Sequence, residues 1–474
     1  MMSTMPLHAI AAELDCQFDG AEARIARINT DSRTIEHGDL YVALRGERFD
    51  GHDFLGDVAK KGAAAAIVNT VTGDALPQLR VDDTRAALGL IARMNRRQFG
   101  GPLIAITGSA GKTTTKEMLA AILAQCGATL ATQGNLNNEI GVPLTLLRIA
   151  PEHRFAIIEM GAARKGDIAY LCRFAEPDIA VLTSAMPAHL EGFGDIDTIA
   201  RTKGEIFAGL RAHGTGVINI DSEYAPLWRE LAGDRRLLTF GLNNEAMVTA
   251  RNIVRTHNGT RFELQGPAGN AVIELQLLGL HNVRNALAAA AAAIAAGAPL
   301  AAIKNGLQSV QAVPGRLQSR AGRAYAGGRE IVIDDSYNAN PGAVKAAIDV
   351  LADYPRPQRL ILGNMAELGP DAERLHLEVA AYAAERGIDE LWCVGPFASK
   401  QVQKFLSTAK NAGAIAFENN ADIISTLSQE MKSEKHAIPA TTLIKGSRSA
   451  GLETVVAALS PNSGPPHSSG AESH

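Results

Sequence analysis

Cysteine is scarce in this chain. Its 474 residues include four cysteines, Cys16, Cys126, Cys172 and Cys393, which are widely scattered. A disulfide framework needs a dense cysteine pattern, and a structural zinc site needs closely spaced pairs of ligands, so neither class of protein is indicated. We expect reduced thiols in a cytosolic protein.

The chain also lacks a strong excess of charge of either sign. Lys and Arg number 46 and Asp and Glu number 50, which gives a formal net charge of −4. A protein that binds nucleic acid usually carries a markedly basic surface. We therefore expect no nucleic acid partner.

Long hydrophobic runs are absent as well. The longest weakly polar stretch, ALAAAAAAIAAGA at 286–298, is too short to span a bilayer and favours a buried helix. The first ten residues, MMSTMPLHAI, lack the charged and apolar regions of a secretory signal. We expect a cytoplasmic protein with no membrane-inserted segment.

What the chain does contain is a long alternation of strands and helices. Short strands, helices and many glycines fill 1–84, apolar β-branched runs alternate with helices over 85–314, and a second such series fills 315–458. Continuous apolar runs are typical of parallel strands buried on both faces. We predict an α/β protein with three domains: a small α/β N-terminal domain, a central parallel-sheet domain with an antiparallel insertion at 247–278, and a C-terminal Rossmann-like domain. The polar Ser/Gly/Pro-rich tail, 459–474, is predicted to be disordered.

Residues 103–118, LIAITGSAGKTTTKEM, have the order of a phosphate-binding loop: strand, glycine turn, Lys-Thr and helix. The usual pattern G-x-x-x-x-G-K-[ST] has a glycine five residues before Gly111, where this chain has Ile106, and the first glycine here is Gly108. A helix N-terminus attracts phosphate oxygens, the lysine binds the β- and γ-phosphates, and the threonine reaches Mg²⁺. The predicted phosphate site comprises Gly108, Ser109, Ala110, Gly111, Lys112, Thr113 and Thr114.

Charged residues also follow other predicted strands. Glu159 ends the apolar run FAIIEMG, and a carboxylate at that edge of a parallel sheet suits a divalent cation that bridges phosphates. His189 follows the strand DIAVLTSA, and Lys203 lies fourteen residues later in a predicted helix. Both belong to the segment that follows a strand at the nucleotide edge, so we treat them as candidate site residues.

Two further helix starts carry polar residues. The stretch LLGLHNVRNALAAAAA has His281 and Asn282 at the mouth of a helix, where amides usually cap but could also contact an adenine edge. The stretch DDSYNANPGAV ends a strand in polar residues before a proline-initiated helix. Its Asp335 could bind a ribose hydroxyl.

The pattern T-G-x-x-G-K-T without the outer glycine resembles the phosphate loop of the Mur ligase family. These ATP-dependent ligases form amide bonds in the cytoplasmic peptidoglycan precursor, and folylpolyglutamate synthetase is a relative. The resemblance covers nearly the whole chain. Its motifs are TDSRTIEHGDLYVALRGERFDGHDF, NLNNEIGVP, EMGAARKGDI, HLEGFGDIDTIARTKGEIF, LGLHNVRNALAA, DDSYNANPGA, LGNMAELG and LIKGSRSAGLE, in that order.

The resemblance also implies roles for individual residues. Lys112, Glu159, His189 and Lys203 would be catalytic, and Mg²⁺ would occupy two sites formed by Thr113 and Glu159, and by His189 with Lys203 as a carbamate. ATP would further contact Asn138, His281, Asn282, Arg316 and Asp335. The uridine-nucleotide sugar would contact Ser32, Arg33, Gly46, Asp50 and His52 in the N-terminal domain.

The implied reaction uses ATP to convert a carboxylate into an acyl phosphate, which an amine then attacks. The motifs most closely resemble the family member that adds D-alanyl-D-alanine to UDP-N-acetylmuramoyl-tripeptide, and we expect a monomer with these small-molecule substrates. Two alternatives remain: a sibling ligase that adds a single amino acid, and a phosphate-loop switch protein that performs no ligation.

Overall fold

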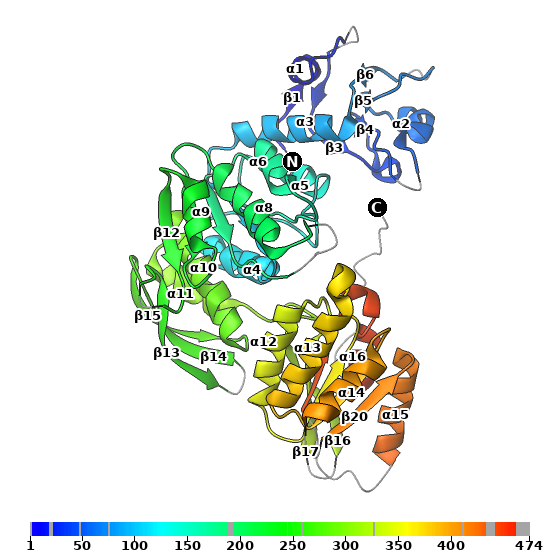
Figure 1. Cartoon of the computed structure of the whole chain (residues 1–474). Helices are drawn as coiled ribbons and strands as arrows, with labels where there is room; N and C mark the ends of the chain where they lie inside the picture. The colour runs from blue at the N-terminus through cyan, green and yellow to red at the C-terminus, as the bar shows by residue number, and fades with distance from the viewer. Residues whose placement is uncertain are drawn as a thin grey trace.

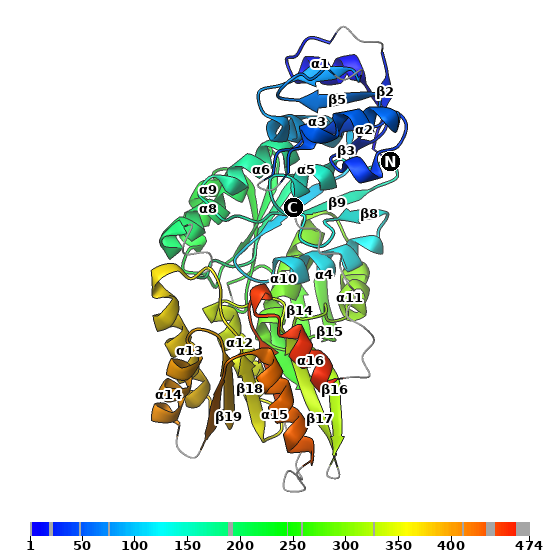
Figure 2. The same ribbon diagram turned by 90° about the vertical axis from the view of Figure 1, so that its right-hand side faces the viewer.

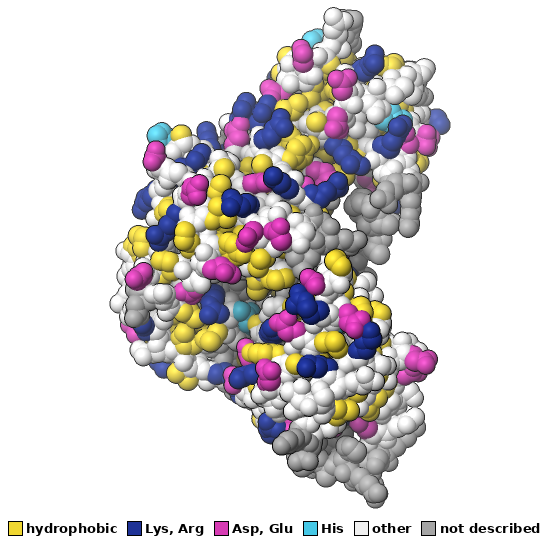
Figure 3. Space-filling model, in the orientation of Figure 1, with side chains coloured by type: hydrophobic (Ala, Val, Ile, Leu, Met, Phe, Trp, Pro, Cys, Tyr) yellow, Lys and Arg dark blue, Asp and Glu magenta, His cyan; other side chains and the backbone are white. Residues whose placement is uncertain are grey.

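The computed structural model describes residues 2–18, 22–46, 49–73, 76–187, 193–243, 245–256, 259–325, 328–409, 412–432 and 441–460. These residues form three modules arranged in an arc, with the N-terminal and C-terminal modules both on the right-hand side of the central one in Figure 1. The space-filling view shows an indentation between those two modules, and basic and acidic side chains are interspersed over this face (Figure 3). The turned view places α3 between the N-terminal and central modules (Figure 2).

The N-terminal module is built on a parallel sheet in the order β3-β4-β5-β6. Its strands are β3 (Ile28–Asn29), β4 (Leu40–Val42), β5 (Ala65–Val68) and β6 (Gln78–Arg80), and the antiparallel pair β1 (Met5–Pro6) and β2 (Arg24–Ile25) lies beside it. The helical elements are α1 (Leu7–Glu13), η1 (Ser32–Thr34), η2 (Gly51–Phe54), α2 (Leu55–Lys60) and α3 (Thr84–Gln98). Asp83 caps α3 by accepting hydrogen bonds from the N–H groups of Arg85 and Ala86.

The central module contains a six-stranded sheet in the order β12-β11-β10-β7-β9-β8, all of whose pairs are parallel. The strands are β7 (Leu103–Thr107), β8 (Thr129–Ala131), β9 (Phe155–Glu159), β10 (Ile179–Leu182), β11 (Thr215–Asn219) and β12 (Arg236–Phe240). The helices are α4 (Lys112–Ala124), α5 (Gly141–Leu146), α6 (Asp167–Ala175), α8 (Ile196–Ala208), α9 (Ala225–Ala232), α10 (Leu280–Ala295) and α11 (Leu300–Ser309).

Alternate residues of the central strands pack into two different cores, as expected for a sheet covered on both faces. Leu103 and Ala105 face α3, α5, α6 and α8, whereas Ile104 and Ile106 face α4, α10 and α11. The second core is completed by an antiparallel sheet of β13 (Thr249–Thr256), β14 (Gly259–Gly266) and β15 (Gly269–Leu275), which confirms the predicted insertion. The alanine run is confirmed as a buried helix, since Ala286–Ala293 of α10 is fully inaccessible to solvent.

The C-terminal module has a six-stranded sheet in the order β16-β17-β21-β18-β19-β20, parallel except for the pair β16 and β17. The strands are β16 (Gln318–Tyr325), β17 (Gly328–Asp335), β18 (Gln358–Leu362), β19 (Glu390–Val394), β20 (Gly413–Phe417) and β21 (Thr441–Lys445). Helices α12 (Pro341–Ala352), α13 (Ala372–Glu385) and α14 (Ala398–Thr408) cover one face, and α15 (Asn420–Lys432) and α16 (Glu453–Leu459) cover the other. The short helices η3 (Gly369–Asp371) and η4 (Arg448–Ala450) lie in connections.

These three sheets confirm the predicted three-domain α/β fold. In the predicted tail, Leu459 ends α16 and Ser460 is buried, while 461–474 lie outside the described residues. Within the part of the chain that the structure describes, no helix combines the length and apolar character needed to cross a bilayer.

Candidate active site

The phosphate loop connects β7 to α4, as its sequence predicts. Gly111 caps α4 with φ +81°, a conformation that L side chains rarely adopt. A Cβ atom there would lie 2.3 Å from Asn285 Oδ1, and one on Gly108 would lie 1.9 Å from Thr183 Oγ1. The loop therefore needs both glycines, because neighbouring strands and helices press against its backbone.

Hydrogen bonds from β10 and its following loop fix the other loop residues. The Ser109 hydroxyl donates to Met186 O at 2.9 Å, and the Ala110 N–H donates to Ser184 Oγ at 3.1 Å. Lys112 Nζ donates to Gly108 O at 2.7 Å, so its ammonium group lies across the loop. Thr114 follows in the first turn of α4.

Glu159 lies next to this loop at the end of β9. Its side chain is 2% exposed, and its Oε2 accepts a hydrogen bond from Thr113 Oγ1 at 3.0 Å. Its other oxygen accepts from Asn137 Nδ2 at 3.0 Å. A carboxylate and a hydroxyl thus converge at the N-terminus of α4, and such oxygen atoms are the ligands that Mg²⁺ prefers.

Two lysines near the loop have depressed pKa values. Desolvation is the main cause for both. The pKa of Lys112 is lowered by this effect against the opposing charge of Glu159. For Lys203, which is 2% exposed on α8, desolvation and the positive charge of Lys112 lower the pKa to about 7. Lys203 Nζ lies 6.0 Å from the centre of the Phe193 ring.

The C-terminal module contributes Arg316 to the same place. Arg316 Nη2 donates to Thr113 Oγ1 at 3.2 Å, which links the two modules directly. Its guanidinium carbon lies 4.5 Å from the centre of the Tyr337 ring, a cation–π contact that fixes its orientation. The hydroxyl of Thr113 therefore meets groups from two modules.

These residues line one large cleft of about 1770 Å³. Its walls include the phosphate loop, Glu159 and Lys203 from the central module, Arg316 and Tyr337 from the C-terminal side, and Arg85 at the start of α3. Asn138 also lines the cleft, and its Oδ1 accepts hydrogen bonds from the N–H groups of Ile140 and Gly141. His189 lies outside the described residues.

Three other predicted ATP contacts, His281, Asn282 and Asp335, are not among the residues that line the cleft. Asn282 Nδ2 donates to Leu278 O at 2.8 Å, so this amide ties the start of α10 to the preceding turn. Desolvation, with a smaller contribution from the charge of Lys445, lowers the pKa of the neighbouring His281 to about 4. Asp335 Oδ2 accepts a hydrogen bond from Lys445 Nζ at 2.6 Å in a buried ion pair, and desolvation raises the pKa of this carboxyl group.

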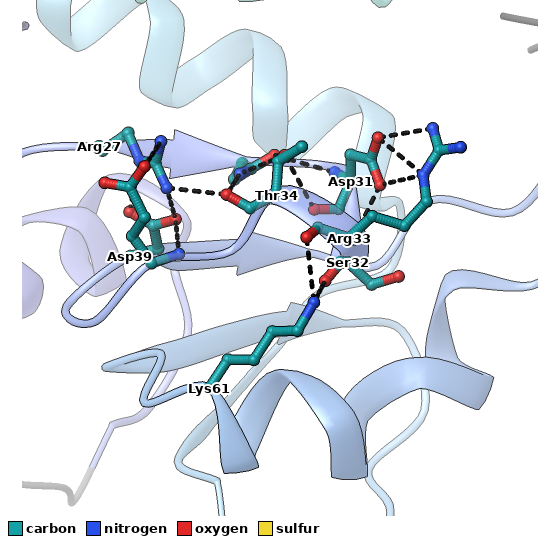
Figure 4. Close-up of polar contacts among 9 residues, drawn as sticks. Arg27, Asp31, Ser32, Arg33, Thr34, Asp39 and Lys61 are labelled. Atoms are coloured by element: carbon teal, nitrogen blue, oxygen red, sulfur yellow. Dashed lines mark hydrogen bonds and ion pairs between the residues drawn. The ribbon is translucent and has the colours of Figure 1, made fainter.

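The predicted sugar-nucleotide residues form two clusters in the N-terminal module. In the first, Ser32 and Arg33 belong to η1, and Lys61 Nζ donates to their carbonyl oxygens at 2.7 and 3.0 Å, as Figure 4 shows. Figure 4 also shows Arg27 bridging from Asp39 to the carbonyl oxygen of Thr34. These contacts hold the backbone of the turn in place.

The second cluster contains Gly46, Asp50 and His52. The Gly46 N–H donates to Phe49 O at 3.0 Å, and Asp50 pairs with Arg45 and with the His52 ring. Although desolvation opposes the shift, hydrogen bonds from the His52 backbone and ring and from Arg45 lower the pKa of Asp50 to about 2. Arg85 connects this loop to the cleft, because its Nη2 donates to Arg45 O at 2.8 Å.

Sequence reasoning did not single out Asn137 and Tyr337 as site residues, although both lie within quoted motifs. The structure brings Asn137 to Glu159 and Tyr337 to Arg316. Asn285, in the second turn of α10, lies against Gly111 of the loop. The dense polar residues of NLNNEIGVP and DDSYNANPGA were the available signal, but only the fold shows which of them turn inward.

Comparison with known families agrees with this geometry. Three family models match: "Mur ligase family, catalytic domain" at 24–96, "Mur ligase middle domain" at 106–293 and "Mur ligase, glutamate ligase domain" at 315–448. The chain belongs to the Mur ligase family. The three matches fall on the N-terminal, central and C-terminal modules of this Mur ligase.

Individual relatives are similar over nearly their full length. The UDP-N-acetylmuramoyl-tripeptide--D-alanyl-D-alanine ligase of Escherichia coli K12 is 43% identical, with 97% of this chain and 99% of that protein covered. A crystal structure of MurF from Acinetobacter baumannii matches with a TM-score of 0.89 and 34% identity over 97% of this chain and all of that one. The structure of MurF from Thermotoga maritima in complex with ADP matches with a TM-score of 0.80 and 28% identity. The match covers 92% of this chain and 97% of that one.

Proposed function

We propose that this chain is an ATP-dependent ligase that adds D-alanyl-D-alanine to UDP-N-acetylmuramoyl-tripeptide in peptidoglycan precursor synthesis. The observation that carries the proposal is the 43% identity, over 97% of the chain, to a ligase of that name. A cleft that joins a phosphate loop to two further modules supports it, because the reaction must bring three substrates together. A phosphate-loop switch protein would not need such a cleft.

The reaction requires activation because a carboxylate has no usable leaving group. Transfer of the γ-phosphoryl group gives an acyl phosphate, and attack by the amine of the dipeptide then releases phosphate. Lys112 and the N–H groups at the start of α4 would stabilise the charge that develops on the phosphoryl oxygens. The relative in complex with ADP supports ATP as the phosphoryl donor.

Thr113 and Glu159 fit a first Mg²⁺ site. Their oxygens lie 3.0 Å apart at the mouth of the loop, and Asn137 orients the carboxylate. Two protein oxygens are enough for such a site, because Mg²⁺ usually keeps water and phosphate ligands. When bound, Mg²⁺ would neutralise negative charge on the phosphates of ATP.

Lys203 and His189 are proposed for the second Mg²⁺ site. An ammonium group would repel a cation, whereas a carbamate formed with CO₂ is an anion with oxygen ligands. Carbamate formation needs the neutral amine, and the pKa of about 7 for Lys203 supports a large neutral fraction near neutral pH.

The remaining assignments follow from the family. Asn138, His281, Asn282, Arg316 and Asp335 are proposed to contact ATP, the last through ribose after domain closure. Ser32, Arg33, Gly46, Asp50 and His52 are proposed for the uridine-nucleotide sugar. We further propose domains at 1–84, 85–314 and 315–458 and a cytoplasmic monomer that binds no nucleic acid.

A substrate comparison tests the proposed function. Purified protein receives ATP, Mg²⁺ and UDP-N-acetylmuramoyl-tripeptide, and phosphate release is measured with D-alanyl-D-alanine or with single amino acids. We expect turnover with the dipeptide and none above background with single amino acids. Preference for a single amino acid would instead support a sibling ligase, and ATP hydrolysis independent of any amine would contradict ligation.

A further inference from the structure

The incoming dipeptide carries a carboxylate that needs a cationic partner in the cleft. This requirement rests on the proposed function. Several lysine and arginine side chains line the cleft, but most have partners already. Lys112 donates to Gly108 O and Lys116 donates to Thr132 O at 2.7 Å each. Lys112 is therefore held by the phosphate loop, and Lys116 by the residue that directly follows β8.

Three arginines of the cleft also have partners. Arg316 bonds Thr113 Oγ1, Arg320 Nη2 lies 2.9 Å from Asp334 Oδ2, and Arg85 donates to Arg45 O. Two arginines of the cleft, Arg164 and Arg448, are different, because both are exposed and no described carboxylate lies within ion-pair distance of either guanidinium group. Arg448 belongs to the C-terminal module, which also carries Arg316.

The backbone that carries Arg448 is nevertheless well anchored. Ser447 Oγ donates to Asn364 O at 2.8 Å, and Asn420 Nδ2 donates to Ala450 O at 2.9 Å. The guanidinium carbon lies 5.6 Å from the centre of the Tyr337 ring. Arg448 is thus a charged group on a fixed turn, oriented by an aromatic ring, with its hydrogen-bonding capacity open to the cleft.

Tyr337 also shows how far Arg448 can lie from the phosphate centre, by which we mean the phosphate loop around Thr113. Arg316, which bonds Thr113, lies 4.5 Å from the same ring centre, so the two guanidinium carbons are separated by no more than the sum of the two ring distances. An extended dipeptide spans about 7 Å, and a single amino acid about half of that. A dipeptide with its amine at the phosphate centre can therefore extend its carboxylate toward Arg448.

We infer that Arg448 binds the C-terminal carboxylate of D-alanyl-D-alanine and thereby favours a dipeptide over a single amino acid. A guanidinium group suits this role because it can donate two parallel hydrogen bonds to one carboxylate. Arg164, another arginine of the cleft, lies on the turn before α6 in the central module, and no described contact relates it to Tyr337 or Thr113.

The test combines a variant with a modified substrate. Arg448→Met is assayed with D-alanyl-D-alanine and with D-alanyl-D-alaninamide, which lacks the carboxylate. In the wild-type protein the amide should have a KM about 10- to 100-fold higher, as loss of a charge-assisted hydrogen bond predicts. In Arg448→Met the KM for the acid should rise to that of the amide, with the KM for ATP unchanged, and Arg448→Lys should lie between the two.

Arg374→Met is the matched control, because Arg374 is an exposed arginine of α13 outside the cleft, and it should behave as wild type. The inference is wrong if Arg448→Met still distinguishes acid from amide, or if the wild-type protein does not. Thermal unfolding verifies that the variants are folded. If Arg448→Met does not fold, Arg448→Lys is used for the comparison of acid with amide. Failure of the proposed function is a separate result, namely no wild-type turnover with the dipeptide.

Discussion

At the scale of single residues, the site contains two lysines whose pKa values are lowered by their surroundings. Lys203 is almost completely buried and close enough to Lys112 for repulsion to contribute to its low pKa. Burial of an ammonium group is unfavourable, and the cost falls when the group loses its proton. A lysine placed in this way is more reactive as an amine than a lysine at the surface.

The first prediction concerns pH. Because the pKa of Lys203 is lowered from 10.5 to about 7, the amine is protonated below pH 7 and increasingly neutral above it. If the carbamate is required, phosphate release at fixed dissolved CO₂ should rise as the pH passes upward through about 7. Lys203→Ala should lose most activity, and chloride or bicarbonate should restore part of it.

The pH profile of the rescued variant provides the control. Lys203→Ala supplied with the rescuing anion should no longer show a step near pH 7, because the titrating amine is gone. Full activity of Lys203→Ala without added anion would contradict a role for this residue in the reaction.

At the scale of elements, the strand, loop and helix around residues 103–124 form one packed unit. The loop backbone touches Thr183, which directly follows β10, and Asn285 of α10. The phosphate site therefore depends on close packing as well as on the helix N-terminus. Substitution of its glycines should weaken nucleotide binding more than the same substitutions would in a solvent-exposed loop.

The second prediction compares two glycines with nearly the same backbone angle. Gly111 has φ +81° with Asn285 Oδ1 in the space of a side chain, whereas Gly297 has φ +82° with nothing within 4 Å. Gly111→Ala should weaken ADP binding at least 10-fold and lower the melting temperature, since strain and a clash together cost about 1–3 kcal/mol or more. Gly297→Ala should show the strain alone and retain ADP binding. Calorimetric titration with ADP measures the difference, and equal affinities in the two variants would refute the packing argument.

Much of this element was predictable from sequence because its signals are local. An apolar β-branched run, glycines and Lys-Thr predict a strand before the loop and a helix after it, which β7 and α4 confirm. The partners of the loop were not predictable in the same way. Asn285 reaches the loop from α10, and Asn137 reaches the neighbouring Glu159 from the segment that follows β8. A polar residue at a helix start or in a loop does not reveal which neighbour it will meet.

The sequence also suggested contacts that the structure arranges differently. His281, Asn282 and Asp335 stand in polar motifs, yet none of them is among the residues that line the cleft. The side chains of Asn282 and Asp335 form hydrogen bonds with nearby protein groups. The reason is physical: a buried polar group needs a partner, and the closest backbone carbonyl or lysine satisfies it. Their assignment to ATP stays a prediction.

At the scale of the whole molecule, residues from more than one module form the cleft. The C-terminal module reaches the phosphate loop through the hydrogen bond from Arg316 to Thr113, while Tyr337 supports the guanidinium group. A reactive acyl phosphate must be protected from water, and closure of modules over the cleft provides such protection.

The third prediction addresses this link. Arg316→Ala should raise the KM for ATP about 10-fold or more, because the C-terminal module loses a charged contact near the phosphates. Arg386→Ala changes an exposed arginine that pairs with Asp349, and it should leave the KM unchanged. Steady-state assays with ATP varied at saturating amine decide between these outcomes, and an unchanged KM in Arg316→Ala would count against coupling of the modules through this residue.

The most direct test of the whole account follows the oxygen atoms of the substrate. UDP-N-acetylmuramoyl-tripeptide is labelled with ¹⁸O in the carboxylate that accepts the dipeptide, and the phosphate released on ligation is analysed by mass spectrometry. If the cleft activates this carboxylate as an acyl phosphate, each phosphate released should carry one ¹⁸O atom. Phosphate without the label, together with normal formation of the amide product, would contradict the account.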